Sequence, residues 1–191
     1  MSQIDREKWD QRYAEDSYNK KTPVILVTDW LPQIPVGRAL DVACGAGRNA
    51  LFLAQSGYRV DAVDISPEGL NMAQKEAVSL GLDINWIEHD LDQSYSFDTD
   101  YNLILVMWFV NLELVTQLCD CLAPGGYLIC EEHLATDEDV IGPNNPNFRV
   151  VPSALREAVS GLEILHYEES VEPIPEGGQV ASARVVAKRQ A

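Results

Sequence analysis

The stretch Ala39-Leu-Asp-Val-Ala-Cys-Gly-Ala-Gly-Arg-Asn-Ala-Leu-Phe-Leu-Ala54 decides the fold of this chain. It opens as a short apolar run that predicts a buried strand, with an acid at Asp41 near the end of that strand. Residues 44–47 are too poor in side chains to continue a strand, and residues 49–54 restore helical spacing. A strand, a glycine turn and a helix N-terminus in this order bring backbone N–H groups up to a ligand.

A second acid lies where a nucleotide site needs one. Seventeen residues after Gly47, a second apolar run ends in Asp64, where a βαβ site places the carboxylate that accepts hydrogen bonds from ribose hydroxyls. The glycine spacing also fits a dinucleotide. However, Asp41 stands four residues before Gly45, and a carboxylate there would repel a pyrophosphate but attract a cationic amine and a sulfonium. The site therefore favours S-adenosylmethionine over NAD.

At these residues the sequence resembles the class I S-adenosylmethionine-dependent methyltransferases, whose first motif reads acid-x-G-x-G-x-G. Here it is Asp41-Val-Ala-Cys-Gly-Ala-Gly47, with alanine at position 43 in place of the first glycine. The Gly-Arg-Asn continuation at 47–49 and the Trp-x-x-Arg-Tyr element at 9–13 are similar to the tellurite-resistance branch of that family. A second family signature, leucine-x-proline-glycine-glycine-x-leucine, stands at residues 122–128.

The resemblance implies an α/β fold: a Rossmann-like, doubly wound, seven-stranded sheet, mainly parallel, with a C-terminal antiparallel hairpin. We expect a single domain, with an N-terminal helical lid over residues 1–36 and the core over residues 37–191. Periodicity and turn residues predict helices at 3–15, 24–31, 49–54, 67–80, 112–122 and 154–160, and strands at 39–42, 60–63, 84–87, 101–107, 127–130, 162–168 and 180–187.

The resemblance also implies where the cofactor lies. The glycine turn and the lid would hold the methionine end, Asp64 the ribose, and Asp90 with Leu91 the adenine. Asp90 as a turn-initiating residue, and Trp9 with Tyr13 as a simple helix anchor, are the structural alternatives. The candidate cofactor residues are Arg12, Tyr13, Asp41, Ala43, Gly45, Gly47, Asn49, Asp64, Ile65, Asp90, Leu91 and Met107.

Ligands of open α/β sheets bind beyond the carboxyl ends of the strands, so residues that follow the strands are candidates for the methyl acceptor. Trp108 is a cation–π candidate for the sulfonium or a core residue, and Asn111 follows it. His133 would orient the acceptor or act as a base, and Arg149, in the loop 137–152, would meet an anionic acceptor.

The final hairpin bears on the acceptor. In the tellurite-resistance enzymes this hairpin brings histidine and arginine towards the oxyanion, whereas the corresponding residues 171–179 here are acidic and lack both. A neutral or cationic amine, thiol or hydroxyl acceptor therefore fits as well as a chalcogen oxyanion.

Composition excludes several partners. A formal net charge of −16 disfavours nucleic acid, which requires a basic patch. The apolar run 103–110 is only as long as a strand, and the N-terminus does not resemble a signal peptide, so we expect a cytoplasmic protein that does not bind membranes. The four cysteines do not have metal-site spacing, so no metal site is predicted. No pattern indicates an oligomeric state.

These features predict a methyltransferase that moves a methyl group from S-adenosylmethionine to a small molecule by in-line displacement, with S-adenosylhomocysteine as the product. A catalytically silent S-adenosylmethionine-binding protein, a protein methyltransferase and an NAD-linked oxidoreductase are the alternatives.

Overall fold

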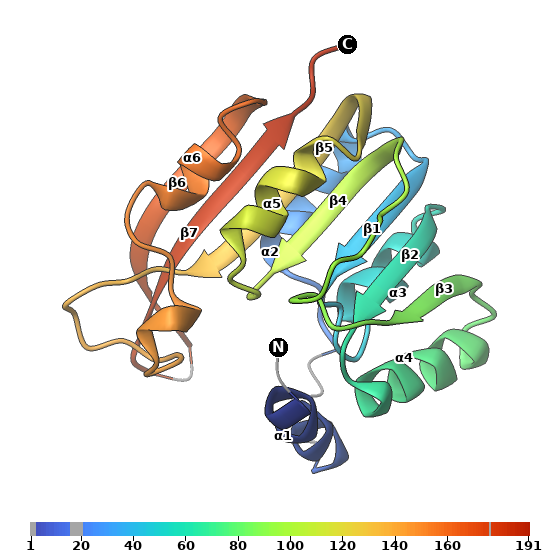
Figure 1. The fold of residues 1–191 in the computed structure, drawn as a ribbon, viewed down its shortest axis with the longest axis horizontal. Coiled ribbons are helices and arrows are strands. Elements are labelled where there is room, and N and C mark those ends of the chain that lie inside the picture. The colour runs from blue at the N-terminus through green and yellow to red at the C-terminus, as the bar shows by residue number, and fades with distance from the viewer. Residues whose placement is uncertain (1–2, 16–20, 176) are drawn as a thin grey trace.

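The computed structural model describes residues 3–15, 21–175 and 177–191, and a single seven-stranded sheet forms its centre (Figure 1). The strands are β1 (Arg38–Val42), β2 (Arg59–Asp64), β3 (Ile84–Glu88), β4 (Tyr101–Met107), β5 (Leu122–His133), β6 (Glu163–Pro173) and β7 (Gln179–Lys188). Their order across the sheet is β3-β2-β1-β4-β5-β7-β6. Strands β1 to β5 run parallel, whereas β7 is antiparallel to both β5 and β6. The predicted doubly wound sheet with its terminal hairpin is confirmed.

Two hydrophobic cores lie on the two faces of the sheet. The helices are α1 (Gln3–Ala14), α2 (Ile25–Trp30), α3 (Arg48–Gln55), α4 (Pro67–Ser79), α5 (Leu112–Cys119) and α6 (Ala154–Ala158), with short 3-10 turns η1 (Leu31–Gln33) and η2 (Pro146–Phe148). One core packs the sheet against α2, α3 and α4, and the other packs it against α5 and α6. Strand β4 is apolar along most of its length because both of its faces are covered.

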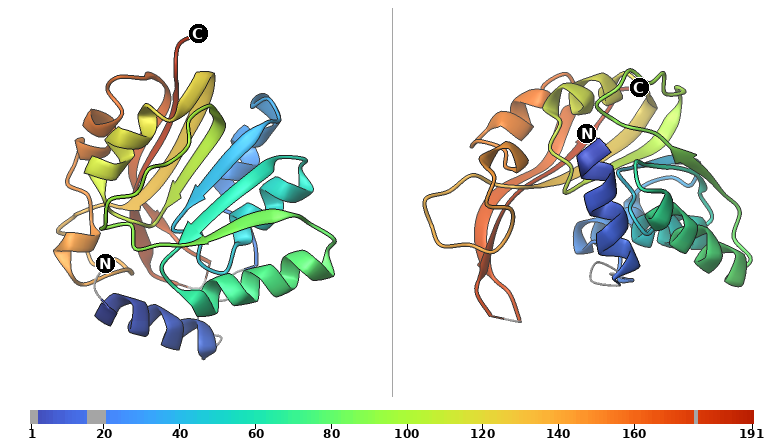
Figure 2. Two further views of the ribbon diagram at one scale, coloured as in Figure 1. Left: turned by 45° about the vertical axis from the view of Figure 1, so that its right-hand side comes forward. Right: turned by 60° about the horizontal axis from the view of Figure 1, so that its bottom comes forward.

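The candidate site lies at the carboxyl ends of the parallel strands. Strand β1 pairs with β2 on one side and with β4 on the other, so the chain leaves the middle of the sheet in both directions. Such a switch in strand order opens a crevice at the carboxyl ends of the strands. Helix α1 lies beyond these strand ends, outside the layers, and contacts α4 (Figures 1 and 2).

The predicted helix 67–80 shows how local sequence signals set an element. Ser66 caps α4 by accepting a hydrogen bond from the backbone N–H of Gly69 at 3.1 Å, and Pro67 occupies the first helical position. The predicted helix is therefore confirmed to within a residue at each end.

The proline-glycine-glycine segment corrects one expectation. It was predicted to separate a helix ending near residue 122 from a strand beginning at Tyr127, but α5 ends at Cys119 and β5 already begins at Leu122. The segment is absorbed as an irregularity in the pairing with β4, between Tyr101 and Leu103. Strand β6 is likewise longer than predicted and continues to Pro173, because it pairs with β7 along its whole length.

Part of the predicted lid lies outside the described residues, namely residues 1, 2 and 16–20, and so does Glu176 of the hairpin connection. Within the described residues, no helix combines the length and the hydropathy that crossing a bilayer requires.

Candidate functional site

The glycine turn after β1 has the geometry of a backbone cradle. Gly45 (φ 57°) and Gly47 (φ 78°) are both in the left-handed region, where a side chain costs energy. The turn is closed by hydrogen bonds from the N–H of Gly47 to the carbonyl of Cys44 at 2.9 Å, and from the N–H of Cys44 to the carbonyl of Val63 at 3.0 Å. Ala43 (φ 54°) is also left-handed, at the position where the family motif has glycine. A left-handed non-glycine residue costs about 1 kcal/mol.

Asp41 lies beneath this turn and is buried, with 1% of its surface exposed. Its carboxylate accepts a hydrogen bond from the backbone N–H of Ala50 in the first turn of α3. Its Oδ2 atom is buried and has no hydrogen-bond partner among the described residues. Burial raises the pKa of Asp41 to about 7, against the lowering effects of the Ala50 N–H and the nearby Arg48 charge.

Asp64, at the end of β2, ties the glycine turn to the start of α4. Its Oδ2 accepts the N–H of Gly45 at 2.7 Å, and its Oδ1 accepts the N–H of Ser66 at 2.8 Å. Burial raises the pKa of this carboxyl, and the backbone N–H groups of Ser66, Gly45 and Ile65 oppose that effect. The two carboxylate oxygens together can accept about four hydrogen bonds, so these three N–H groups leave capacity for a ribose hydroxyl.

Tyr13 of α1 covers the glycine turn. A Cβ atom added to Gly45 would lie 2.2 Å from the hydroxyl oxygen of Tyr13, and one added to Gly69 would lie 2.9 Å from Cε2 of the same ring. Asp10 anchors the helix, because its Oδ1 accepts hydrogen bonds from the Ser66 hydroxyl at 2.5 Å and from the Glu68 N–H at 3.4 Å. Helix α1 therefore lies over the glycine turn, and its role as a lid over the cofactor stays a prediction.

The side chains of the Trp-x-x-Arg-Tyr element of α1 also contact one another. The rings of Trp9 and Tyr13 stack with centroids 6.1 Å apart, and the guanidinium of Arg12 lies 4.8 Å from the centre of the Trp9 ring. Arg6 of the same helix pairs with Glu88 at the end of β3. Helix α1 thus spans the site from the glycine turn to the strand that precedes Asp90.

A cavity of about 610 Å³ lies between α1 and the ends of β2 and β3. Ile65 and Asp90, two of the predicted cofactor residues, line it together with residues of α1. One oxygen of Asp90 accepts the N–H of Asp92 at 3.0 Å, so this residue does form the turn that was its structural alternative. Turn formation uses only part of what the carboxylate can accept.

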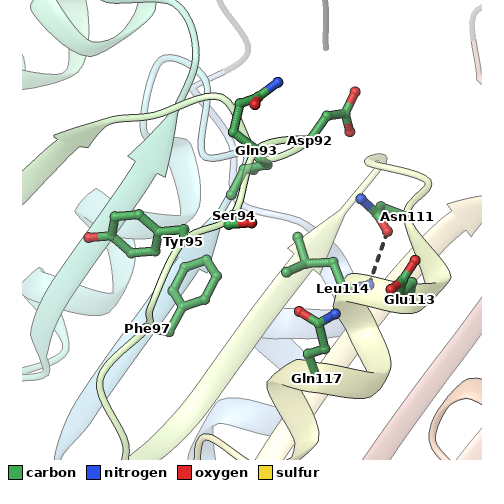
Figure 3. Close-up of a pocket in the computed structure, with 10 residues that line it drawn as sticks. Asp92, Gln93, Ser94, Tyr95, Phe97, Asn111, Glu113, Leu114 and Gln117 are labelled. Carbon is green, nitrogen blue, oxygen red and sulfur yellow. Dashed lines mark hydrogen bonds between the residues drawn. The ribbon is translucent and has the colours of Figure 1, made fainter.

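Leu91 faces a second cavity, of about 310 Å³, between the loop that follows β3 and α5 (Figure 3). Asn111 lines the same cavity, and its side-chain oxygen caps α5 by accepting the N–H of Leu114 at 3.0 Å. A capping role is what an asparagine before an apolar helix favours. Asn111 was predicted to contact the methyl acceptor. The only sequence signal of its capping role is its position directly before the helix.

The end of β4 brings two predicted acceptor residues together. Trp108 follows buried Met107 and has a left-handed backbone (φ 62°), and its ring centroid lies 4.4 Å from that of His133 at the end of β5. A bulky residue in this conformation carries about 1–3 kcal/mol of strain, and such strain concentrates at functional sites. Trp108 and His133 form a wall at the strand ends beside the glycine turn.

Two other predicted residues have structural tasks. Arg149 donates from Nε to the carbonyl of Pro143 at 2.9 Å and from Nη1 to that of Leu134 at 2.9 Å, so it holds the loop that follows β5. That loop passes close to His133, because a Cβ on Gly142 would lie 3.1 Å from His133 Nδ1. Asn49 accepts the N–H of Val24 at 3.0 Å and ties the segment before α2 to α3.

A cluster of charges on β5, β6 and β7 was not predicted from the sequence. Arg184 of β7 pairs with Glu131 at 2.9 Å, Glu172 at 2.8 Å and Glu168 at 3.5 Å. Hydrogen bonds and charge from Glu172 and Glu131 raise the pKa of Arg184 above its ordinary value, against the lowering effect of burial. The four residues come from three strands, so only the sheet register brings them together. The sequence signal of a polar face there is a polar residue at every second position, namely Glu168, Ser170 and Glu172.

The model of the family described as tellurite resistance protein TehB matches residues 8–180 of this chain. The chain belongs to this family. The resemblance to the tellurite-resistance branch of the class I methyltransferases is thereby confirmed.

Individual relatives agree with this assignment. The chain is 27% identical over 168 residues to the "Probable S-adenosyl-L-methionine-dependent methyltransferase TehB" of Haemophilus influenzae strain 10810, covering 82% of this chain and 58% of that protein. It is 34% identical over 142 residues to "Hemagglutinin 1" of Eikenella corrodens, covering 70% of this chain and 46% of that protein. The chain thus spans about half the length of the curated relatives it matches.

A solved structure supports the fold of the TehB-family chain. The crystal structure of TehB from Haemophilus influenzae superposes with a TM-score of 0.78 at 23% identity, over 95% of this chain and 67% of that one. Across the described parts of the chain, no group of three or more His, Cys, Asp or Glu side chains is arranged to hold a metal ion.

Proposed function

We propose that this chain binds S-adenosylmethionine at the glycine turn and transfers the methyl group to a small-molecule acceptor. The observation that carries the proposal is the cradle around Gly45. It combines a bare left-handed backbone, the Tyr13 ring above it and the buried, unpartnered Oδ2 of Asp41 below it. A buried anionic acceptor with no partner of its own suits a ligand that carries an ammonium and a sulfonium.

Each part of the cofactor has residues that fit it. Asp41, Gly45 and Gly47 would hold the methionine end beneath Tyr13, with Arg12, Ala43 and Asn49 around the same turn. Asp64 would bind the ribose, since its carboxylate retains capacity to accept a further hydrogen bond. Ile65, Asp90 and Leu91 would enclose the adenine, and Met107 would close the inner end of the site.

The cofactor supplies an already activated methyl group, so this chain mainly has to align the two reactants and exclude water. Trp108 and His133 form the wall at which the acceptor would approach, opposite the leaving sulfur, for in-line displacement. Because a base is needed only for an acceptor that keeps its proton at neutral pH, His133 would take that proton or simply orient the acceptor.

We further propose that the acceptor is neutral or cationic. On the adjacent strands β5, β6 and β7, the cation of Arg184 is matched by three carboxylates, and in the loop after β5 Arg149 is engaged by two carbonyls. An oxyanion would have to compete with these partners. The net charge of −16 also supports a small molecule over a nucleic acid.

The test is calorimetric titration of the purified protein with S-adenosylmethionine, S-adenosylhomocysteine and NAD, repeated on Asp64→Ala. We expect the first two ligands to bind, NAD not to bind, and the variant to lose most of the affinity. Binding of NAD alone would overturn the proposal.

An acceptor screen follows, with amines, thiols and hydroxyls in one arm and tellurite and selenite in the other. Turnover with the oxyanions only would overturn the neutral or cationic acceptor. Binding without turnover in either arm would favour the silent S-adenosylmethionine-binding protein.

A further inference from the structure

Glu132 is a carboxylic acid buried completely inside the sheet layer. Its exposed fraction is 0%, and it lies on the face of β5 that packs against α5 and α6, between the apolar neighbours Cys130 and Leu134. Strand alternation turns the flanking Glu131 and His133 to the opposite face. A buried carboxyl in such a place is costly, and the methyl transfer outlined above does not use it.

The two oxygens of Glu132 have unequal surroundings. Oε1 accepts the backbone N–H of Phe109 at 3.1 Å and the thiol of Cys130 at 3.7 Å. Oε2 is buried and has no hydrogen-bond partner within the described chain. Burial raises the pKa of Glu132 well above its ordinary value, and the neighbouring charge of Glu131 adds to this, so the protonated acid is favoured. A protonated carboxyl still offers its carbonyl oxygen to Phe109.

The hydrogen bond falls directly after the strained residue. Trp108 has φ 62°, which an indole-bearing residue rarely adopts without support. Two successive N–H groups of this turn are held by two successive residues of β5: the N–H of Trp108 by the carbonyl of Glu131 at 2.8 Å, and the N–H of Phe109 by the side chain of Glu132. With both amides fixed, the Trp108 ring lies against His133.

We propose that Glu132 is a positioning residue for the methyl-transfer site: from the far face of the sheet, it holds the left-handed turn at Trp108 and so keeps the indole against His133. The inference rests on the proposed function for what Trp108 faces, while the link from Glu132 to the turn rests on geometry. Glu132 touches neither reactant; it acts through the backbone of Phe109.

The test uses variants that separate the effect of the hydrogen-bond-accepting oxygen of Glu132 from the effect of its side-chain size. Glu132→Gln keeps a carbonyl oxygen at the same reach, Glu132→Met keeps the length without an acceptor, and Glu132→Asp keeps a carboxyl but shortens its reach. Leu155→Ala is the matched control, because it removes side-chain bulk from a fully buried position of the same hydrophobic core but removes no hydrogen-bond acceptor.

The readout is the fluorine NMR spectrum of protein labelled with 5-fluorotryptophan, with the Trp108 resonance assigned from Trp108→Phe. In the wild type and in Glu132→Gln we expect one narrow resonance that shifts when S-adenosylhomocysteine is added. In Glu132→Met and Glu132→Asp we expect it to move or split. Turnover in these two variants should fall by about tenfold or more, with the KM for S-adenosylmethionine changed by less than about threefold, since misplacement acts on alignment.

Three results would overturn the positioning role. They are an unchanged Trp108 resonance in Glu132→Met and Glu132→Asp, an equal disturbance in Leu155→Ala, and no rescue by glutamine. Calorimetry on the same samples separates the two proposals. If the wild type binds S-adenosylhomocysteine but the Trp108 resonance does not respond, the positioning role fails and cofactor binding stands. If the wild type does not bind it, the proposed function fails first.

Discussion

The two halves of the candidate site are built from different materials. The cofactor half, around β1, α3 and β2, is made of backbone N–H groups in a glycine turn and two acids, Asp41 and Asp64. These two acids are 23 residues apart in the chain. The acceptor half, around β4, β5, β6 and β7, is made of side chains brought together by strand register. The first is therefore nearly a local structure, whereas the second depends on the whole sheet.

The largest expected effect tests how far the acceptor half depends on its own charges. Arg184→Met leaves Glu131, whose side chain is 6% exposed, without its cation. We expect a loss of about 3 kcal/mol in the free energy of unfolding, because a buried charge left unpaired is strongly destabilising. Cofactor affinity should stay unchanged, since the cluster lies outside the cofactor half. Denaturant unfolding and calorimetry measure the two effects.

Glu172→Gln is the control for that variant, because this partner is 46% exposed and should contribute at most about 1 kcal/mol. If Arg184→Met also abolished cofactor binding, the two halves would be coupled and the comparison would fail.

The next effect breaks the cofactor half. Gly45→Ala places a Cβ 2.2 Å from the Tyr13 hydroxyl at a left-handed position, so Tyr13 and α1 must move. We expect affinity for S-adenosylhomocysteine to fall by about a hundredfold, since loss of the cover also loosens the cradle. Gly125→Ala is the matched control, because it is equally left-handed (φ 77°) but has open space around it.

Both glycine variants should lose about 1 kcal/mol of stability from backbone strain, and only Gly45→Ala should lose affinity. Equal affinities would show that Tyr13 does not cover the cofactor.

Asp41 sharpens the electrostatic side of the comparison. Its folded-state pKa of about 7 lies above the ordinary 3.8, so between these values the folded protein binds more protons than the unfolded chain. The Asp41 contribution to stability is present below the ordinary value and is lost as pH rises towards 7. Asp41→Asn should remove this slope, as thermal unfolding between about pH 4 and pH 7 would reveal.

Ligand binding should respond in the opposite direction. An ammonium beside Asp41 favours the ionised acid, so affinity for S-adenosylhomocysteine should rise by about three- to tenfold between about pH 6 and pH 8 in the wild type. The same titration on Asp41→Asn should be nearly flat. A wild-type affinity that does not change with pH would show that the amine of the ligand does not bind beside Asp41.

The smallest effect concerns Ala43, the residue that departs from the family motif. Ala43→Gly should stabilise the protein by about 0.5–1 kcal/mol, because glycine relieves the left-handed strain at φ 54°. Affinity should stay within about twofold. Ala46→Gly, in the same turn but without a positive φ, should instead be neutral or destabilising. Thermal unfolding of both variants is the measurement. Stabilisation by Ala43→Gly alone supports relief of backbone strain, whereas stabilisation by both variants supports a general effect of glycine.

The sequence predicted the fold well, and it placed the glycine turn and its two acids correctly at the strand ends; that these residues bind the cofactor stays a prediction. Apolar runs without alternation mark strands covered on both faces, and the glycine turn with Asp41 and Asp64 marks the switch point between them. The strand bounds near residues 122 and 173 were predicted less well, because pairing with a neighbour can absorb a proline-glycine-glycine irregularity or extend a strand. Local propensity does not contain that neighbour.

The individual roles of the acceptor residues were beyond the reach of the sequence. Trp108 and His133 were expected at strand ends, and their ring contact came only with the register of β4 and β5. Arg149 and Asn111 were expected to meet the acceptor, yet hydrogen bonds to the loop and to α5 engage them in the structure. Such competition between partners cannot be read from residue type.

By itself, the sequence of this chain determined the βαβ cradle and the acid beside it, because a glycine turn needs only residues close in the chain. Tertiary structure alone decided the acceptor half: the left-handed Trp108, the buried Glu132 beneath it and the Arg184 cluster. The physical reason is that strand register brings together side chains from distant segments, and burial then sets which of them keep their charge.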